Sequence, residues 1–300
     1  MMLKSIAQCP IALALAAPMR VSFLPALTHK IIFFMTNSNG IMTGKRGLVM
    51  GVANERSIAW GIAKTLADEG AELTFTYQGE AFEKRLMPLA ESIGSSIVQQ
   101  CDVEAEGSLQ AVFDRLATEW GALDFIVHSL AYSDKKELNG RYVDTTAENF
   151  VRTMNISCFS FTAVAQAAYP LMKKTGGSMI TLTYYGAERV LPNYNVMGVA
   201  KAALEASVRY LAADLGPDGI RVNAVSAGPM RTLAGSAIGG ARKIYNMSEA
   251  NAPLRRSVTL EQLGGTALYL LSDLGSGVTG ETHHVDSGYN IVGMPYLSGE

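Results

Sequence analysis

The sequence is poor in the residues that build cross-links and metal sites. It has three cysteines in 300 residues, widely spaced and without a CxxC pair. This pattern indicates neither a disulfide framework nor a thiolate metal site, and it fits a reducing compartment. The four histidines lack the HExxH spacing of a zinc site, so we expect structural roles for them and no bound metal.

An excess of charge of either sign is also missing. The chain has 27 acidic and 25 basic side chains and a net charge of −2. This balance provides neither the broad basic surface that binds nucleic acid nor an acidic tail for partner proteins. The apolar run KIIFFM from Lys30 is too short to span a bilayer. We therefore expect neither nucleic acid nor a membrane as partner, and we look for function in local side-chain chemistry.

From Gly44 onward, short apolar runs alternate with longer segments of helical spacing, such as 57–70 and 108–121. This alternation is typical of βαβ units. The fold class that we predict is α/β, a single-domain Rossmann-type doubly wound parallel sheet of about seven strands, with six helices distributed over both faces. The expected strands are 46–51, 72–77, 96–100, 123–129, 177–183, 220–226 and 282–286.

The segment GVANERSIAWG follows the first expected strand. At this place a doubly wound sheet presents a helix N-terminus, whose free N–H groups and dipole favour a pyrophosphate. Gly51 allows a tight turn, Ser57 offers a hydroxyl to phosphate or caps the helix, and Gly61 permits close packing. A glycine at a strand end and a serine cap are common, so this segment alone is a weak indication of a nucleotide.

Three later positions favour a dinucleotide. Gln78 ends the second expected strand, where an acidic residue would select NAD and an arginine would accept the phosphate of NADP. A neutral glutamine favours NADH and leaves NADPH as an alternative. Asp102 offers a carboxylate to the adenine amino group or, alternatively, caps the next helix. Residues 129–131 follow the fourth strand and would run beneath the nicotinamide ribose.

Tyr194 precedes Lys201 by seven residues at the start of an apolar-patterned helix. At 3.6 residues per turn, this spacing brings both side chains to one helix face, two turns apart. Such a pair suits hydride transfer. The phenol hydrogen-bonds an oxygen that gains negative charge, and the ammonium holds the cofactor ribose and lowers the phenol pKa. The alternative is a structural role, because a tyrosine packed in the core and a lysine exposed on the helix would produce the same sequence pattern.

Eight segments carry a resemblance to a known family: GVANERSIAWG, YQ, CDV, HSLA, YYGAER, NYNVMGVAK, RVNAVSAGPMRT and HVDSGY. In this order they resemble the bacterial NADH-dependent enoyl-[acyl-carrier-protein] reductases, a divergent branch of the short-chain dehydrogenases, over about residues 42–297. In ordinary short-chain dehydrogenases the catalytic tyrosine lies four residues before the lysine and the catalytic serine thirteen before that tyrosine. Met197 and Tyr184 occupy those positions here, which argues against a carbonyl reductase.

The resemblance implies reduction of the trans-2 double bond of enoyl thioesters by NADH in fatty acid elongation. Conjugate reduction moves charge to the thioester oxygen, so the donor stands elsewhere than in a carbonyl reductase. The resemblance implies that Tyr194 hydrogen-bonds this oxygen and that Lys201 holds the nicotinamide ribose. Tyr184 would take a supporting place beside the substrate. Met230 would orient the nicotinamide carboxamide with its backbone, with Thr232 nearby.

Two sets of contacts follow from this resemblance. Cofactor contacts are expected at Gly51, Ser57, Ile58, Gln78, Asp102, Val103, Ser129, Leu130, Ala131, Lys201, Met230 and Thr232. Substrate contacts are expected at Ala131, Tyr132, Tyr184, Tyr194, Met197, Ala234 and Ile238. Ala131 replaces a glycine common in the family, which predicts tighter contact over the nicotinamide. Methionines and aromatics at helical spacing are also typical of plain core.

The glycine- and alanine-rich segment of about residues 230–257 predicts a mobile substrate lid, with an ordinary surface loop as the alternative. Near the pocket mouth, Arg242, Lys243, Arg255 and Arg256 would meet an acidic acyl carrier protein or be merely solvated. The family implies a homotetramer, and the long apolar helices at 149–174 and around Lys201 would pair between subunits or be buried within one chain.

Residues 1–41 differ from the rest. A lysine, a short apolar run and small residues superficially fit a secretory signal, but we favour an N-terminal extension because the catalytic domain at 42–300 needs a cytosolic cofactor. We thus expect a cytoplasmic enzyme. Two rival functions are a 3-oxoacyl reductase of the ordinary short-chain type and a catalytically silent NAD-binding regulator.

Overall fold

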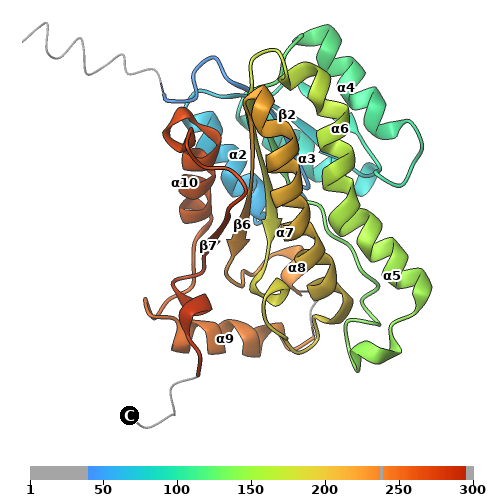
Figure 1. Cartoon of the computed structure of the whole chain (residues 1–300), viewed down its shortest axis with the longest axis vertical. Coiled ribbons are helices and arrows are strands. Elements are labelled where there is room, and N and C mark those ends of the chain that lie inside the picture. Colours follow the sequence, from blue (N-terminus) through green and yellow to red (C-terminus); the bar gives the residue numbers. More distant parts are fainter. Residues whose placement is uncertain (1–39, 237–238, 295–300) are drawn as a thin grey trace, which may run out of the picture. The chain divides into compact units, whose positions relative to one another are not determined.

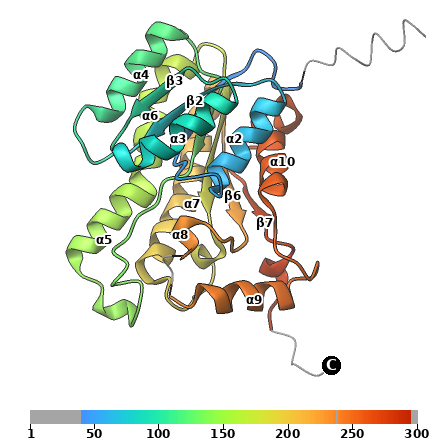
Figure 2. The same ribbon diagram turned by 180° about the vertical axis from the view of Figure 1, so that it is seen from behind.

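Seven parallel strands form one sheet in the part of the chain that the structure, a computed structural model, describes: residues 40–236 and 239–294. The strands are β1 (Arg46–Met50), β2 (Glu72–Tyr77), β3 (Ile97–Gln100), β4 (Phe125–His128), β5 (Gly177–Thr183), β6 (Ile220–Ala227) and β7 (Thr282–Val285). Their order is β3-β2-β1-β4-β5-β6-β7 (Figures 1 and 2). The direction of winding reverses between β1 and β4, where ligands of open α/β sheets bind. The seven predicted strands are confirmed.

Nine α-helices are present in the described residues, three more than predicted. They are α2 (Ile58–Asp68), α3 (Glu80–Ser92), α4 (Ser108–Glu119), α5 (Ala147–Met154), α6 (Ser160–Met172), α7 (Asn195–Leu215), α8 (Leu233–Ser236), α9 (Ala241–Asn251) and α10 (Leu260–Leu271). The helix expected at 149–174 is divided by a π turn at Asn155–Phe159, and its start is capped by Thr146, whose hydroxyl accepts from Asn149 N–H. The segment expected as a loop-like lid contains α8 and α9. The helical count was therefore too low, because the π turn divides one expected helix into α5 and α6 and the glycine-rich segment forms α8 and α9.

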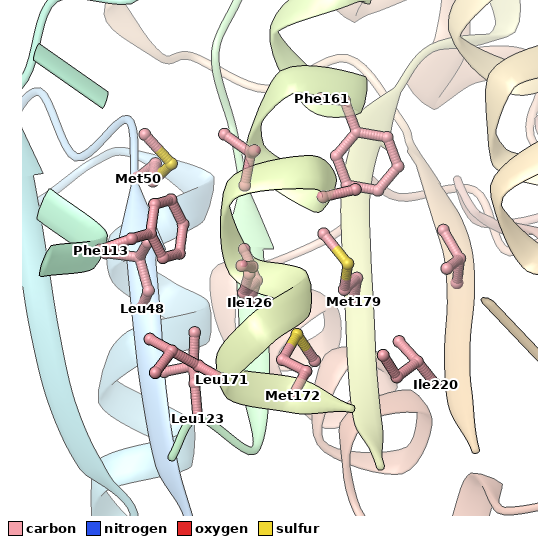
Figure 3. Close-up of a cluster of buried hydrophobic side chains, with 14 of the residues drawn as sticks. Leu48, Met50, Phe113, Leu123, Ile126, Phe161, Leu171, Met172, Met179 and Ile220 are labelled. Atoms are coloured by element: carbon pink, nitrogen blue, oxygen red, sulfur yellow. The ribbon is translucent and has the colours of Figure 1, made fainter. Parts of the chain in front are cut away.

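Alternate residues of each central strand pack against different helices. On β1, Leu48 and Met50 belong to the core beneath α4, α6 and α7, whereas Val49 faces α2, α3 and α10. Figure 3 shows the first of these clusters, with Phe161 and Met172 of α6 lying over the strands. Both faces are covered, so the strands read as apolar runs rather than as alternating patterns. Removing the fully buried Phe161 ring would cost about 3–5 kcal/mol.

Helices α2 and α10 pack closely because two glycines remove side chains from their contact. A Cβ on Gly61 would lie 2.6 Å from Leu260 Cβ, and one on Gly264 would lie 2.0 Å from Thr65 Oγ1. This agrees with the packing role predicted for Gly61. Thr259 and Gln262 form a capping box that fixes the start of α10. The first helix after β1 is thereby held in place, and with it the turn that precedes the helix.

The histidines and cysteines within the described residues have structural partners. His128 is fully buried, with Nδ1 2.9 Å from Thr181 Oγ1 and Nε2 2.9 Å from Ser160 Oγ, and burial lowers its pKa to about 3. His284 Nε2 lies 2.6 Å from Glu188 Oε1. Among the described residues we find no cluster of metal-ligating side chains and no helix long and apolar enough to cross a membrane. His29 and the predicted extension at 1–41 lie outside the described residues, apart from its last two positions.

Candidate active site

A cavity of about 700 Å³ opens at the carboxyl ends of the strands, near the point where the winding reverses. Residues from the ends of β1, β2, β4, β5 and β6 line it, together with parts of α7, α8 and α9. Figure 1 shows α8 and α9 at the end of the sheet toward which β6 points. The predicted site residues that line this cavity are Gly51, Ile58, Gln78, Ser129, Leu130, Ala131, Tyr132, Tyr184, Tyr194, Met197, Lys201, Met230 and Thr232.

Three predicted site residues lie outside the cavity lining, and the side chains of two others are not described. Ser57, Asp102 and Val103 do not line the cavity, and the neighbouring Cys101 does so in place of Asp102. Ala234 lies in α8, where its side chain is not described, and Ile238 lies outside the described residues.

The turn after β1 brings the backbone close to β4. Gly51 has a φ of +93°, and a Cβ at this position would lie 2.1 Å from Ser129 O. Both the left-handed conformation and the close approach require glycine. The turn therefore packs tightly against the end of β4, and its backbone lines the cavity next to the N-terminus of α2. It fits a dinucleotide, whose pyrophosphate needs a close approach of backbone N–H groups.

Ser57 is the N-cap residue of α2, but its hydroxyl makes no capping hydrogen bond, and Ser57 does not line the cavity. Its Oγ accepts hydrogen bonds from the N–H groups of Ala53 and Asn54, both at 3.0 Å. The hydroxyl instead ties the loop between β1 and α2 to the helix start, because its lone pairs satisfy two N–H groups of that loop. Ser57 thus shapes the turn that the cavity uses.

The two side chains predicted to contact the adenosine part of the cofactor, those of Gln78 and Asp102, are hydrogen-bonded to each other. Gln78 Nε2 donates to Asp102 Oδ2 at 3.0 Å, and Asp102 Oδ1 accepts from Glu104 N at 2.9 Å. The capping alternative for Asp102 is also wrong, since Gly107 is the N-cap residue of α4 and Ser108 Oγ accepts from Asp102 N. Asp102 is therefore a partner that fixes Gln78 and a local turn.

Tyr194 lies at the start of α7, with 7% of its surface exposed. The helix begins one residue later, so Tyr194 is its N-cap residue rather than part of its face. A Cβ on Gly186 would lie 2.3 Å from Tyr194 Cδ1, and one on Gly198 would lie 2.8 Å from Gly186 O. The two glycines let the tyrosine ring and the backbone at Gly186 approach each other closely. Tyr184 meets this ring edge-on at a centroid distance of 5.2 Å.

Burial raises the pKa of the Tyr194 phenol above its usual value, with smaller contributions from Tyr184 and Glu205. The pKa of Tyr184 is raised as well, mainly by burial. The phenol pKa of Tyr194 thus lies above its usual value and not below it as expected, because the loss of water around the phenolate is the largest contribution. Both tyrosines are protonated at neutral pH, and each offers a hydroxyl proton to an acceptor in the cavity.

Lys201 lines the same cavity from the second turn of α7. Its Nζ donates to Leu182 O at 2.7 Å, and only 6% of the residue is exposed. Burial lowers the pKa of Lys201 to about 8, while Cys158 and Glu205 act in the opposite direction. The ammonium has three protons and uses one for Leu182. Two remain for oxygen acceptors in the cavity.

The segment after β6 is held by α9. Met230 O accepts hydrogen bonds from Thr232 N and from Tyr245 Oη, both at 2.8 Å. A Cβ on Gly235 would lie 2.5 Å from this carbonyl, so only glycine fits there. Tyr245, its neighbour Ile244 and the more distant Leu138 line the cavity but were not predicted. The sequence feature that could have indicated Ile244 and Tyr245 is the adjacent apolar pair in KIYN, within an otherwise polar helix.

The four basic residues expected at the pocket mouth separate into two places. Arg242 and Lys243 are exposed on α9, next to the cavity-lining Ile244. Arg256 lines a second cavity of about 550 Å³, which also includes His283 and His284. Arg255 Nη1 donates to Ala250 O. The grouping of all four at one mouth was therefore wrong, since α9 and the following turn carry the chain away.

The family model that matches residues 51–290 is described as enoyl-(acyl carrier protein) reductase. The chain belongs to this family. It is 64% identical over 259 residues to enoyl-[acyl-carrier-protein] reductase [NADH] 2 of Rhizobium meliloti, covering 86% of this chain and 96% of that protein. These matches confirm the resemblance seen in the sequence.

Solved structures give the same relationship. The crystal structure of FabI from Candidatus Liberibacter asiaticus is 56% identical, with a TM-score of 0.84 over 86% of this chain and 99% of that chain. A reductase of the same kind from Anaplasma phagocytophilum, in complex with NAD, is 58% identical, with a TM-score of 0.83 over 87% of this chain and 99% of that chain. The Rossmann-type fold is confirmed by these similarities.

Proposed function

We propose that this chain reduces the trans-2 double bond of enoyl-[acyl-carrier-protein] thioesters in fatty acid synthesis, with Tyr194 stabilising the enolate and Lys201 holding the cofactor ribose. The enzyme uses NADH, as its relatives' names state. The observation that carries the assignment of roles is the convergence of Tyr184, Tyr194 and Lys201 on one cavity. That cavity also contains the glycine turn suited to a dinucleotide.

The protonated phenol of Tyr194 performs the central task. It donates a hydrogen bond to the thioester oxygen, which becomes the enolate oxygen when electron density moves away from the β carbon. Its raised pKa keeps the proton on the phenol at neutral pH, so the group is ready to donate. Tyr184 meets the Tyr194 ring edge-on and fixes its place beside the substrate. A proton then adds to the α carbon and completes the saturated acyl chain.

Residues at the cofactor end of the cavity bind NADH and orient its nicotinamide. NADH, when bound, supplies the hydride for the β carbon. The turn at Gly51, which lines the cavity, presents its backbone to the pyrophosphate, Lys201 directs its two remaining N–H donors to the nicotinamide ribose, and Met230 offers its backbone to the carboxamide. The predicted contacts at Ile58, Ser129, Leu130, Ala131 and Thr232 line the same cavity and belong to this proposal.

The acyl chain occupies the apolar part of the cavity. Tyr132, Met197 and the cluster of Leu138 with Tyr194 form its wall, and residues of about 230–257 form the substrate lid. Water is excluded when this lid is in place, which strengthens the hydrogen bond to the enolate oxygen. The catalytic domain in this proposal is 42–300, preceded by an extension at 1–41.

Exposed side chains on the surface suit two kinds of partner, an acyl carrier protein and further copies of this chain. Arg242 and Lys243 are exposed beside the cavity and suit an acidic acyl carrier protein. Large apolar side chains are exposed on the helices expected to pair between subunits: Val151 at 66%, Phe159 at 56% and Tyr210 at 76%. These exposures support a homotetramer, because a monomer would leave this apolar surface in water. The location that we propose is the cytoplasm.

The test follows the loss of NADH absorbance with the full chain and either a short trans-2-enoyl thioester or a 3-oxoacyl thioester, repeated with NADPH. We expect oxidation with the enoyl substrate and a much lower rate in Tyr194→Phe. Consumption of the 3-oxo substrate alone would make the chain a carbonyl reductase. Cofactor binding without any turnover would favour a regulator.

A further inference from the structure

Tyr194 stands between two residues with unusual backbone conformations. Asn193 has a φ of +61° and Asn195 a φ of +41°. Among the described residues only two other non-glycine positions, Arg255 and Ser287, have positive φ. Side-chain-bearing residues rarely adopt this region, although asparagine tolerates it better than most. Strained conformations persist where the surroundings hold them, often at functional sites.

The two asparagine side chains hold different walls of the cavity. Asn193 Nδ2 donates to Gly239 O, two residues before the first residue of α9, at 2.9 Å. Asn195 Nδ2 donates to Glu137 O, in the loop after β4, at 2.9 Å. Each bond pins the backbone of a separate segment to a direct neighbour of Tyr194. The tyrosine is therefore fixed from both sides by contacts that its own ring does not make.

The two walls also meet each other at this point. A Cβ on Gly239 would lie 2.1 Å from Asn139 Oδ1 and 3.4 Å from Asn193 Nδ2. Only glycine can approach both asparagines so closely. Leu138, next to Asn139, packs in one cluster with Tyr194 and Met197. Three segments distant in sequence thus converge at the side of Tyr194, and one of them leads into the lid.

We propose that Asn193 and Asn195 are positioning residues for Tyr194, and that Asn193 makes the orientation of Tyr194 depend on the docking of Gly239. This inference rests on the role proposed above for Tyr194. When Gly239 is docked, the Asn193 amide has its acceptor and the left-handed turn before Tyr194 is stabilised. When Gly239 moves away, that turn loses its partner and the phenol loses its fixed direction. Closure of the lid over the substrate thereby also orients the Tyr194 hydroxyl as hydrogen-bond donor.

The test uses the matched variants Asn193→Asp and Asn195→Asp in the full chain. Aspartate has nearly the same shape and also tolerates positive φ, but a carboxylate oxygen replaces the N–H donor facing a carbonyl. Trypsin cleavage after Arg242 and Lys243, mapped by mass spectrometry without cofactor, reports whether the start of α9 is held. We expect Asn193→Asp to accelerate this cleavage about fivefold, the effect of one lost hydrogen bond. Asn195→Asp should leave the cleavage rate unchanged.

Steady-state kinetics separates the two asparagines further. Asn193→Asp should raise KM for the enoyl thioester and lower kcat, each about tenfold, because both docking and orientation are lost. Asn195→Asp should lower kcat to a similar degree with KM retained. The dissociation constant of NADH, measured by fluorescence, should change less than twofold in both. The Asn193→Gly variant keeps the positive φ without an amide and should behave as Asn193→Asp does.

Equal cleavage rates in wild type, Asn193→Asp and Asn193→Gly would overturn the coupling to Gly239. Equal acceleration by Asn195→Asp would also overturn it, since general loosening would then explain the result. A kcat within twofold of wild type in both aspartate variants would overturn the positioning of Tyr194. A wild type that reduces no enoyl thioester would overturn the proposed function, while the cleavage rates still decide whether Asn193 holds Gly239.

Discussion

The two ends of the cavity have different tasks, cofactor binding and proton donation, and use different parts of the chain for them. At the cofactor end, after β1 and β2, the structure relies on the bare backbone of Gly51 and on the exposed pair of Gln78 and Asp102. At the reaction end, after β5 and at the start of α7, it relies on the buried side chains of Tyr194 and Lys201. A large anionic ligand needs close access to N–H groups, whereas proton donors need an environment that fixes their ionisation.

The largest effect is expected at the reaction end, from Tyr194→Phe. Loss of the hydroxyl removes the donor to the developing enolate, so kcat with an enoyl thioester should fall about 10²–10³-fold. NADH affinity should stay within about twofold, because binding belongs to the other end. The matched variant Tyr184→Phe should lower kcat only about tenfold. A greater loss in Tyr184→Phe would reverse the roles of the two tyrosines.

At the cofactor end, Gly51→Ala should weaken NADH binding at least about a hundredfold and lower the free energy of unfolding by about 2–4 kcal/mol. The added Cβ would lie 2.1 Å from Ser129 O. Gly94→Ala is the control, since Gly94 also has a positive φ of +73° but no neighbouring atom within 4 Å. It should lose only about 1–2 kcal/mol and keep its NADH affinity. Urea unfolding and fluorescence titration measure the two quantities, and equal losses of affinity would contradict the close-approach argument.

Lys201 links the two ends through its charge. Its pKa of about 8 means that the ammonium is present below this pH and is lost as the pH rises through it. Because the charged form holds the ribose, NADH affinity should fall above pH 8, by at most about tenfold per pH unit. Titrations of the wild type from pH 6.5 to 10 test this, with Lys201→Met as the control that should lack the pH-dependent fall. An affinity in the wild type that is constant to pH 10 would show that the charge is not used.

The smallest effect is expected at Gln78. Gln78→Arg removes the hydrogen bond to Asp102 and adds a cation near the adenosine ribose, which should shift the ratio of NADPH to NADH affinity about tenfold toward NADPH. Gln78→Leu removes the hydrogen bond without adding charge and should leave the ratio nearly constant. Competitive binding of the two cofactors measures this ratio. The same shift in both variants would mean that Asp102, rather than charge at position 78, sets the preference.

Motifs and local spacing were enough to predict side chains that meet at one site from the end of β5, the start of α7 and its second turn. Tyr184, Tyr194, Met197 and Lys201 were all expected at one site, and all line the cavity. The partners of the Ser57 and Asp102 side chains were not predicted, because they are nearby backbone N–H groups and Gln78, and such contacts leave no pattern in a sequence. Tyr245 was not predicted, because it meets Met230 O only through the placement of α9 beside the segment that follows β6.

The sequence by itself determined the alternation of strands and helices, the turn at Gly51 and the family to which the chain belongs, since these follow from local periodicity and from motifs. Only the tertiary structure decided the ionisation of the site. Burial raises the pKa of Tyr194 and lowers that of Lys201, opposite to what their spacing suggested for the phenol. The physical reason is that desolvation depends on every segment packed around a group.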